Sequence, residues 1–353
     1  MKSKIVRGSL VTLLSLLLAF VGQEDPFFTI KKKDVQLKIP AHFPDPKYDF
    51  STNPLTPKGF ELGRKLFYDP LLSKDSSVSC GSCHQQYAAF AHIDHALAHG
   101  IGGRIGNRNV PTLQNLIWKE SFMWDGGINH LEVQAIAPLT NPLEMDETLA
   151  NIIAKLNARS DYRNAFYAAY QDSTANSEHL LKSLAQFMGL MISANSKYDQ
   201  YQAGLTEFTP EEENGLALFR KKCASCHTEP LFTSTRFANN GLEVNPRLNE
   251  LGRATITGNQ EQDFYRFKVP SLRNVTRTFP YMHDGRFSSI KAVLDHYADT
   301  ANYSAYADTL MDQIGPLSEA DINDLAVFLS TLTDKTFLYD RRFADPNFQR
   351  ATR

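Results

Sequence analysis

Two short segments constrain this chain more than any other feature of its sequence, namely residues 80–84 and 223–227. Both have the pattern C-x-x-C-H, which is the attachment signature of a c-type haem. Two thiols on one turn can form thioethers with the vinyl groups of a haem, and the histidine is then held beneath the iron as its proximal ligand. The sequence therefore predicts two covalently attached haems, whose attachment residues are Cys80, Cys83, His84, Cys223, Cys226 and His227.

The alternative for these segments is a zinc site or a redox-active dithiol. Zinc ribbons place their cysteine pairs about 15–20 residues apart. Here the first pair lies at residues 80–83 and the second at residues 223–226, which is a far longer separation. Zinc also gives no reason for a histidine to follow both pairs. The two segments use all four cysteines of the chain, so no disulfide is expected.

Length and composition set broad limits on the fold. A chain of 353 residues is long enough for two domains. Its hydrophobic content of 42% and aromatic content of 11% are typical of a globular protein with sizeable cores. The formal net charge of −2 gives no indication of nucleic-acid binding.

The N-terminus has the pattern of an export signal. Basic residues precede an apolar run from Leu10 to Val21, which is short for a membrane span. We expect residues 1–22 to be a signal peptide or, because the cleavage site is weak, an uncleaved N-terminal anchor. Export to the periplasm agrees with c-type haem, which is attached outside the cytoplasm.

Helical periodicity dominates the remaining sequence, so the expected fold class is mainly α. The pattern predicts a linker over 23–50 with Lys31–Lys33 as a solvated patch, a first haem domain over 51–205 and a second over 206–345. Between the helices, 85–145 and 228–287 are loop-rich, and long loops inside compact domains are usually functional. Helices are predicted from Pro57 with Thr56 as cap, over 147–157, 161–171 and 177–201, from Pro210 with a capping box, over 288–298 and over 319–332.

The two halves of the chain repeat each other. Residues 110–127 align with 269–286 without a gap at a constant offset of 159, with seven identical positions. Such a repeat predicts two haem domains of one design related by internal duplication.

Continuing this offset aligns Tyr297 with Pro138. Ile290, Val293, Leu294 and Tyr297 share one helical face, so Tyr297 is expected to point inward. Tyrosinate is a known haem ligand, whereas proline has no donor atom for iron. The second haem is then closed and six-coordinate and the first is open. The alternative is a core tyrosine whose hydroxyl is hydrogen-bonded.

With these features, the chain resembles the bacterial di-haem cytochrome c peroxidase and MauG family over about residues 50–335. The resemblance depends on the two attachment motifs together with segments 108–112, 124–126, 131–135, 141–145, 269–274 and 280–285. It implies that the N-terminal haem is peroxidatic and that the C-terminal haem takes in electrons.

The resemblance also implies roles for individual residues. Glu144 matches a distal catalytic carboxylate, Gln134 a distal glutamine, and Trp124 a tryptophan between the haems. A carboxylate above a haem can move a proton between the two peroxide oxygens. The alternatives are a helix cap or surface position for Glu144 and plain packing for Trp124.

Calcium is a further cofactor that the resemblance implies, at a site between the haems. Asn109, Thr278 and Pro280 match its ligands, the last two through backbone carbonyls. The alternative for Asn109 is a residue that only holds a turn.

The sequence departs from the family pattern in three places. Tyr297 stands where the ordinary peroxidases carry methionine and MauG carries tyrosine, with Met282 and then His296 as fallback ligands. Lys221 stands where MauG carries a tryptophan used to oxidise its protein partner. A distal histidine is not assigned, although the nearest candidates to its place are His99, His95 and His92.

Three functions follow from these features. The leading one is reduction of hydrogen peroxide to water with electrons from a small cytochrome c or copper protein. The second is a MauG-like oxidase acting on a protein or organic substrate. The third is an electron carrier without catalysis, against which Glu144, Gln134 and Pro138 argue. A second copy of the chain is a further candidate partner.

Overall fold

The computed structural model describes residues 30–347 of the chain. The expected signal segment, 1–22, lies outside these residues. No helix within residues 30–347 combines the length and the apolar character needed to cross a membrane. The helices are α1 (Pro57–Tyr68), α2 (Cys80–Cys83), α3 (Ile136–Thr140), α4 (Leu149–Ala158), α5 (Ser160–Tyr170), α6 (Ser177–Gly189), α7 (Lys197–Gln202), α8 (Pro210–Lys222), α9 (Ile290–Ala298), α10 (Glu319–Ser330) and α11 (Lys335–Leu338).

Short 3-10 turns and one very small sheet complete the fold. The 3-10 turns used below are η6 (Leu116–Trp118) and η7 (Glu132–Ala135). Strands β1 (Phe237–Ala238) and β2 (Phe267–Lys268) pair antiparallel, with Phe237 opposite Lys268. The expected mainly α class is therefore confirmed.

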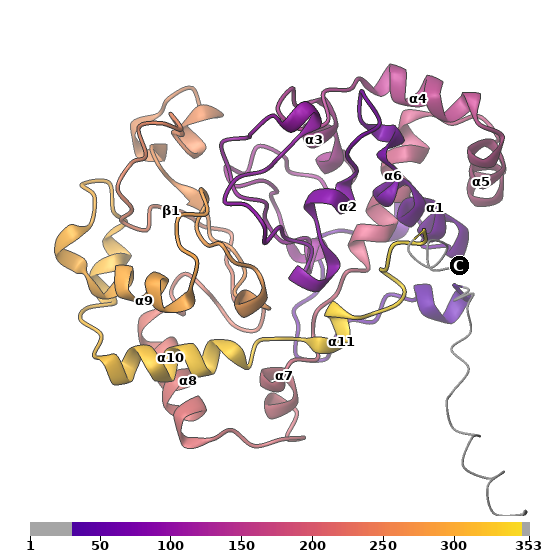
Figure 1. Cartoon of the computed structure of the whole chain (residues 1–353). Coiled ribbons are helices and arrows are strands. Elements are labelled where there is room, and N and C mark those ends of the chain that lie inside the picture. Colours follow the sequence, from indigo (N-terminus) through magenta and orange to yellow (C-terminus); the bar gives the residue numbers. More distant parts are fainter. Residues whose placement is uncertain (1–29, 348–353) are drawn as a thin grey trace, which may run out of the picture.

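The N-terminal half is built around α1 and α6, which pack side by side (Figure 1). Thr56 caps α1 as predicted, because its hydroxyl accepts a hydrogen bond from the amide of Gly59. Gly63 permits the close approach of the two helices, since a Cβ there would lie 2.0 Å from the carbonyl oxygen of Ser183. Buried aromatic side chains such as Phe67 fill the core between them.

The C-terminal half repeats this arrangement with α8 and α10 (Figure 1). Thr209 and Glu212 form the predicted capping box at the start of α8. Gly215 takes the place of Gly63, because a Cβ there would lie 2.1 Å from the carbonyl oxygen of Asp324. Each half thus has its own helix pair and its own core.

The duplication extends to the loops that follow each haem motif. Phe122 bridges Ile128 in the first half, and their counterparts at an offset of 159, Tyr281 and Phe287, form the same bridge in the second. Asn115 and its counterpart Asn274 both have left-handed backbone, with φ of 54° and 59°.

Equivalent loops also meet each other across the middle of the molecule. The amide of Asn109 donates to the carbonyl of His283 at 2.6 Å, and the amide of Lys268 donates to the carbonyl of Trp124 at 2.7 Å. At an offset of 159, Asn109 corresponds to Lys268 and Trp124 to His283. The repeat thus maps each of these two hydrogen bonds onto the other. The halves are therefore related by an approximate two-fold axis that passes between them.

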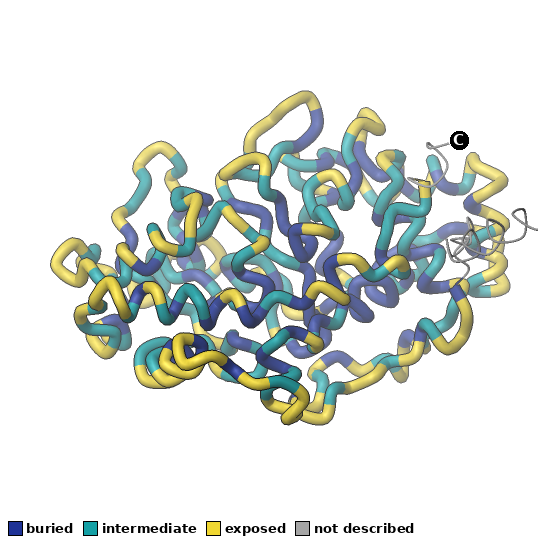
Figure 2. Tube along the Cα trace, turned by 60° about the horizontal axis from the view of Figure 1, so that its bottom comes forward, coloured by how far each residue is buried: buried dark blue, intermediate teal, exposed yellow. Residues whose placement is uncertain are grey.

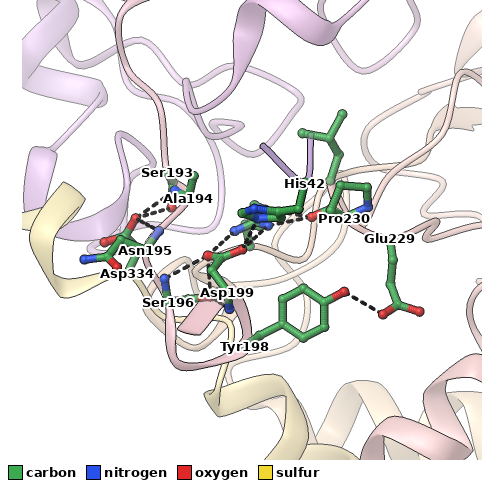
Figure 3. A network of polar contacts seen from close by, with 12 residues as sticks. His42, Ser193, Ala194, Asn195, Ser196, Tyr198, Asp199, Glu229, Pro230 and Asp334 are labelled. Carbon is green, nitrogen blue, oxygen red and sulfur yellow. Dashed lines mark hydrogen bonds and ion pairs between the residues drawn. The ribbon is translucent and has the colours of Figure 1, made fainter. Parts of the chain in front are cut away.

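The expected helix over 177–201 is interrupted, so this prediction is wrong in its middle. α6 ends at Gly189 and α7 begins at Lys197. Ser196 opens α7 through a capping box with Asp199. In the gap, the carboxylate of Asp334 accepts hydrogen bonds from three successive residues, Ser193, Ala194 and Asn195 (Figure 3). The connection between the halves is thus held by side chains instead of by a continuous helix.

The ends of the described chain both pack on the first core. Within the expected linker 23–50, Val35 and Phe43 are buried in that core, so its described part is not a free linker, although Lys31–Lys33 is exposed as expected. Phe337 and Phe343 return to the same core, although the expected boundary places them in the second domain. Buried segments run through the middle of the molecule, and exposed loops form its rim (Figure 2).

Candidate haem and peroxide site

A continuous cavity of about 560 Å³ joins the two halves at their meeting point. Both haem attachment motifs open onto it, through Cys83 and His84 and through Cys223, Cys226 and His227. A largely apolar cavity with a few placed polar groups is typical of a cofactor site. The candidate catalytic and ligand residues that line it are Trp124, Gln134, Pro138, Glu144, Met282 and Tyr297.

The first attachment motif forms a single helical turn, α2, and His84 is the residue that ends this turn. Gly81 is required there, because a Cβ would lie 2.3 Å from the ring of Tyr68. His84 Nδ1 donates to the carbonyl oxygen of Phe90 at 2.6 Å. Burial lowers the pKa of His84 to about 4, so the imidazole is neutral and its Nε2 is available to a metal.

The second attachment motif follows α8, with Cys223 at the helix end. His227 Nδ1 donates to the carbonyl oxygens of Phe232 at 3.2 Å and Pro270 at 3.1 Å. Burial lowers the pKa of His227 to about 4. Both histidines therefore have the orienting hydrogen bond and the neutral state that an iron ligand needs.

The cysteines fit thioether attachment better than a thiolate site. All four are free, and burial raises the pKa of Cys80 and Cys223 to about 12. The two pairs belong to different cores. Between residues 30 and 347, no group of three or more His, Cys, Asp or Glu side chains is placed to hold a metal ion. The residues present thus fit two c-type haems, and a four-thiolate zinc centre is not formed.

Glu144 faces the cavity on the side of the first motif. Its Oε1 accepts a hydrogen bond from Asn141 Nδ2 at 2.7 Å. Burial raises the pKa of Glu144, and the Asn141 hydrogen bond and the charge of Arg108 oppose this shift only in part. The helix after it, α4, is capped by Thr148, so Glu144 is neither a helix cap nor a surface carboxylate.

Three further side chains complete this side of the cavity. Gln134 lies on η7, is 8% exposed and faces the same space as Glu144. Pro138 on α3 lines the cavity without a donor atom. Trp124 Nε1 donates to the carbonyl oxygen of Asn109 at 2.8 Å, which fixes its ring at the meeting point of the halves.

Tyr297 and Met282 both face the cavity near the second motif. Tyr297 shares its helical face with Ile290, Val293 and Leu294, all of which line the cavity, so the predicted inward face of α9 is confirmed. Burial raises the pKa of Tyr297 to about 12, although a hydrogen bond with the Asn240 side chain acts in the opposite direction.

The remaining candidate ligands lie elsewhere. His296 turns away from this space, and its Nε2 lies 2.8 Å from the carbonyl oxygen of Asn240. His92, His95 and His99 also lie outside the cavity wall. The His95 ring stacks on His92 with centroids 5.2 Å apart and contacts the tilted ring of His99 at 4.1 Å.

The candidate calcium ligands Asn109, Thr278 and Pro280 line the same cavity. Asn109 Nδ2 donates to the carbonyl oxygen of Ala96 at 2.8 Å, which leaves Oδ1 as a possible ligand atom. Oxygen atoms of amide and carbonyl groups are ligands that Ca²⁺ accepts.

The lining residues to which the sequence assigned no role include Lys119, Asn240, Lys268 and His283. The repeat contained a signal for His283, because it is the counterpart of Trp124. Its ring stacks on Phe267 with centroids 3.8 Å apart. Asn240 belongs to a loop outside the aligned segment, and nothing in its sequence surroundings distinguished it.

Comparison with known proteins identifies the class to which this fold and site belong. A family model described as di-haem cytochrome c peroxidase matches residues 57–207, and one described as cytochrome c matches residues 212–333. The chain belongs to the di-haem cytochrome c peroxidase and MauG family, whose members carry two c-type haems.

Particular relatives include both branches of the family. The methylamine utilization protein MauG of Methylorubrum extorquens is 35% identical over 84% of this chain and 83% of its own length. The cytochrome c551 peroxidase of Nitrosomonas europaea is 30% identical over 67% of this chain and 71% of its own. A crystal structure of a MauG-like protein associated with microbial copper homeostasis matches with a TM-score of 0.79 and 30% identity, over 88% of this chain and 99% of that one.

Proposed function

We propose that this protein is an oxidoreductase that reduces hydrogen peroxide to water. One peroxide, two electrons and two protons give two water molecules. The observation that carries the proposal is the buried carboxyl group of Glu144 in the cavity beside the first haem motif. An electron carrier has no use for a proton-transferring group at an open iron site.

The bound haem supplies an iron that accepts peroxide and exchanges electrons with it. Glu144 takes the proton from one peroxide oxygen and returns it to the other, so that the departing oxygen leaves as water. Asn141 holds the carboxylate through its 2.7 Å hydrogen bond. Gln134 is placed to orient the substrate, and Pro138 keeps that side of the site free of a competing ligand.

Electrons enter at the C-terminal haem site from an external donor. Relatives named cytochrome c peroxidases support a small redox protein as donor, and we propose a small cytochrome c or copper protein. Trp124 lies at the meeting point of the halves, through its contacts with Asn109 and Lys268, and is suited to mediate transfer between the sites. We place the reaction in the periplasm.

Calcium between the haems belongs to the same proposal. Asn109 supplies its side-chain oxygen, and Thr278 and Pro280 supply backbone carbonyls from the opposite half. A cation at this position would join the two halves where their loops meet.

A MauG-like oxidase remains the second candidate, because Tyr297 faces the cavity where an anionic oxygen would bind the second iron. An anionic ligand favours high oxidation states and hence oxidation of a further substrate. The MauG relative of Methylorubrum extorquens supports this candidate. Against it, the exposed residue before the second motif is Lys221, which cannot be oxidised as a tryptophan can.

Peroxide consumption by the purified di-haem protein distinguishes these functions. With a reduced small cytochrome c as donor, a peroxidase consumes one peroxide for every two cytochromes oxidised. A MauG-like oxidase instead consumes peroxide while it oxidises an organic or protein substrate. A carrier exchanges electrons with the cytochrome but leaves peroxide intact, and that outcome would refute both enzymatic proposals.

A further inference from the structure

Two lysine side chains from opposite halves line the cavity between the haem motifs. Lys119 directly follows η6 in the first half, and Lys268 ends β2 in the second. Both belong to the cavity wall. Burial lowers the pKa of Lys268 to about 8, and burial together with repulsion from Lys268 lowers the pKa of Lys119. The two side chains thus face the same cavity from opposite halves.

Neither ammonium group has a partner in the described part of the chain. Within residues 30–347, no carboxylate lies within ion-pair distance of Lys119 or Lys268 Nζ, and neither makes a side-chain hydrogen bond. The other cations of the cavity wall differ in this respect. Arg108 pairs with Asp125 and Glu250, and Lys222 donates to backbone carbonyls near the end of the wall.

Two unpaired cations in one buried space are costly, because charge removed from water must be compensated. The compensating negative charges must therefore come from the cofactors that occupy the cavity. A c-type haem is attached through its vinyl groups, so its two propionate carboxylates remain free and anionic. Two haems bring several carboxylates into this cavity, and Lys119 and Lys268 are the cations still without a partner there among the described residues.

The approximate two-fold axis gives this pair a definite place. At an offset of 159, Lys268 is the counterpart of Asn109, and Lys119 is the counterpart of Thr278. Asn109 and Thr278 are the proposed calcium ligands. The lysines therefore occupy, on the other side of the axis, the position equivalent to the calcium site. On one side of the axis, Asn109 and Thr278 offer oxygen ligands for a cation. On the other side, Lys268 and Lys119 carry positive charges themselves.

We propose that Lys119 and Lys268 form a carboxylate-binding site that holds haem propionates at the meeting point of the two halves. Each half contributes one ammonium group, so the site is complete only when both halves are docked. The inference depends on the presence of both haems and not on the reaction they perform. Its chemical requirement is a carboxylate, which the haems supply and a soluble anion could imitate.

The test uses the di-haem protein with Lys119→Gln, Lys268→Gln and both changes together. Lys47→Gln is the control, because Lys47 is exposed and pairs with Glu120 on the surface. Haem content is measured first by the pyridine haemochrome assay, so that loss of haem is separated from loss of the lysine contact. Spectroelectrochemical titration then gives the reduction potential of each haem.

Removing a cation beside a propionate should make reduction harder. We expect at least one haem in each single variant to lose about tenfold in its reduction equilibrium constant, which is about 59 mV for one electron. Lys119→Arg and Lys268→Arg should largely restore the parent potential, which a purely steric role would not predict. Potentials equal to those of Lys47→Gln would overturn the proposal.

Two further measurements distinguish the source of the carboxylate. If the site takes a soluble anion, added acetate shifts the potentials of the parent but not of the double variant, and the propionate assignment is wrong. A crystal structure of the unsubstituted di-haem protein decides the matter even if a variant fails to retain haem. It should place both Nζ atoms within hydrogen-bond distance of propionate oxygens, and any other partner there would refute the assignment.

Discussion

Asn240 Nδ2 donates a hydrogen bond to Met282 Sδ across 3.1 Å. The same amide side chain hydrogen-bonds Tyr297, so one residue contacts both candidate ligands of the second iron. An amide donor stabilises a phenolate oxygen, whereas a thioether sulfur that accepts one hydrogen bond keeps its second lone pair for a metal. We propose Tyr297 as the axial ligand, with Met282 as the alternative.

The first prediction concerns this choice. Tyr297→Phe removes the phenol oxygen but keeps the ring, so packing on α9 should survive. We expect an altered low-spin electron paramagnetic resonance signal and a raised reduction potential at one haem only. Iron binding also requires the phenol to ionise far below its pKa of about 12 in the folded chain without iron, as metal charge makes possible.

Tyr303→Phe is the matched control for this variant. The Tyr303 hydroxyl donates to the backbone oxygen of Tyr297 at 2.7 Å, so it is a nearby phenol outside the cavity wall. Its loss should leave both haem spectra unchanged. If Tyr297→Phe also matches the parent, the ligand is a different side chain, with Met282 as the first to examine through Met282→Leu and His296 as the second.

The second prediction concerns haem attachment. The intact protein should carry two haems by mass and by the pyridine haemochrome assay. Cys83→Ala and Cys226→Ala should each leave one thioether at a single site and shift the haemochrome band of that site alone, because the two motifs lie in separate halves. A parent protein with one haem, or with zinc in place of haem, would contradict the assignment.

Sequence periodicity and the repeat predicted much of this structure for physical reasons. Thr56 and the capping box at Thr209 mark helix starts because they satisfy free backbone amides locally. The offset of 159 located equivalent loops, because duplicated segments keep their local hydrogen bonds. The inward direction of Tyr297 followed from helical spacing alone.

Features that depend on contacts between distant segments could not be predicted in this way. The break after Gly189 depends on Asp334, far along the chain, which accepts the backbone amides of the gap. In the sequence, nothing distinguishes Lys119 and Lys268 from ordinary surface lysines, because they line one cavity only when the two halves are packed together. The same docking leaves His99 outside the cavity, although its position in the sequence lies close to the first motif.

The third prediction concerns the buried ion pair between Asp199 and Arg273, which are 4% and 0% exposed. Arg273 donates to both carboxylate oxygens of Asp199, and His42 Nε2 lies 2.8 Å from Asp199 Oδ1 (Figure 3). Asp199→Asn leaves the guanidinium buried without its charge partner. We expect a loss of about 3–5 kcal/mol in the free energy of unfolding, measured by urea denaturation.

The pH dependence of stability provides a second readout for this pair. Burial alone would raise the pKa of Asp199, but the hydrogen bonds and charge of Arg273, together with hydrogen bonds from Ser196, more than offset this and hold the pKa below 3.8. The stabilisation is therefore complete above the unfolded pKa of about 3.9 and is lost as pH falls through the folded pKa. The variant should lack this acid-side loss. Asp295→Asn, which breaks an exposed pair with Lys291, should cost at most about 1 kcal/mol.

The last prediction concerns Glu144 and its raised pKa. To accept the first proton from peroxide, the carboxyl group must be ionised in the resting protein. Activity is therefore present above the folded pKa of Glu144 and falls as pH drops through it, at a pH above the ordinary value of 4.5. Glu144→Gln keeps the shape and the contact with Asn141 but cannot exchange a proton.

We expect Glu144→Gln to retain both haems while kcat/KM for peroxide falls by about 10²–10⁴-fold. The acid limb of the pH profile should disappear with it, because the group that titrates is gone. Glu120→Gln is the control, since its carboxylate is exposed and pairs with Lys47, and its turnover and acid limb should match the parent. If Glu144→Gln behaves like Glu120→Gln, proton transfer during O–O cleavage uses another group, and the role proposed for Glu144 is wrong.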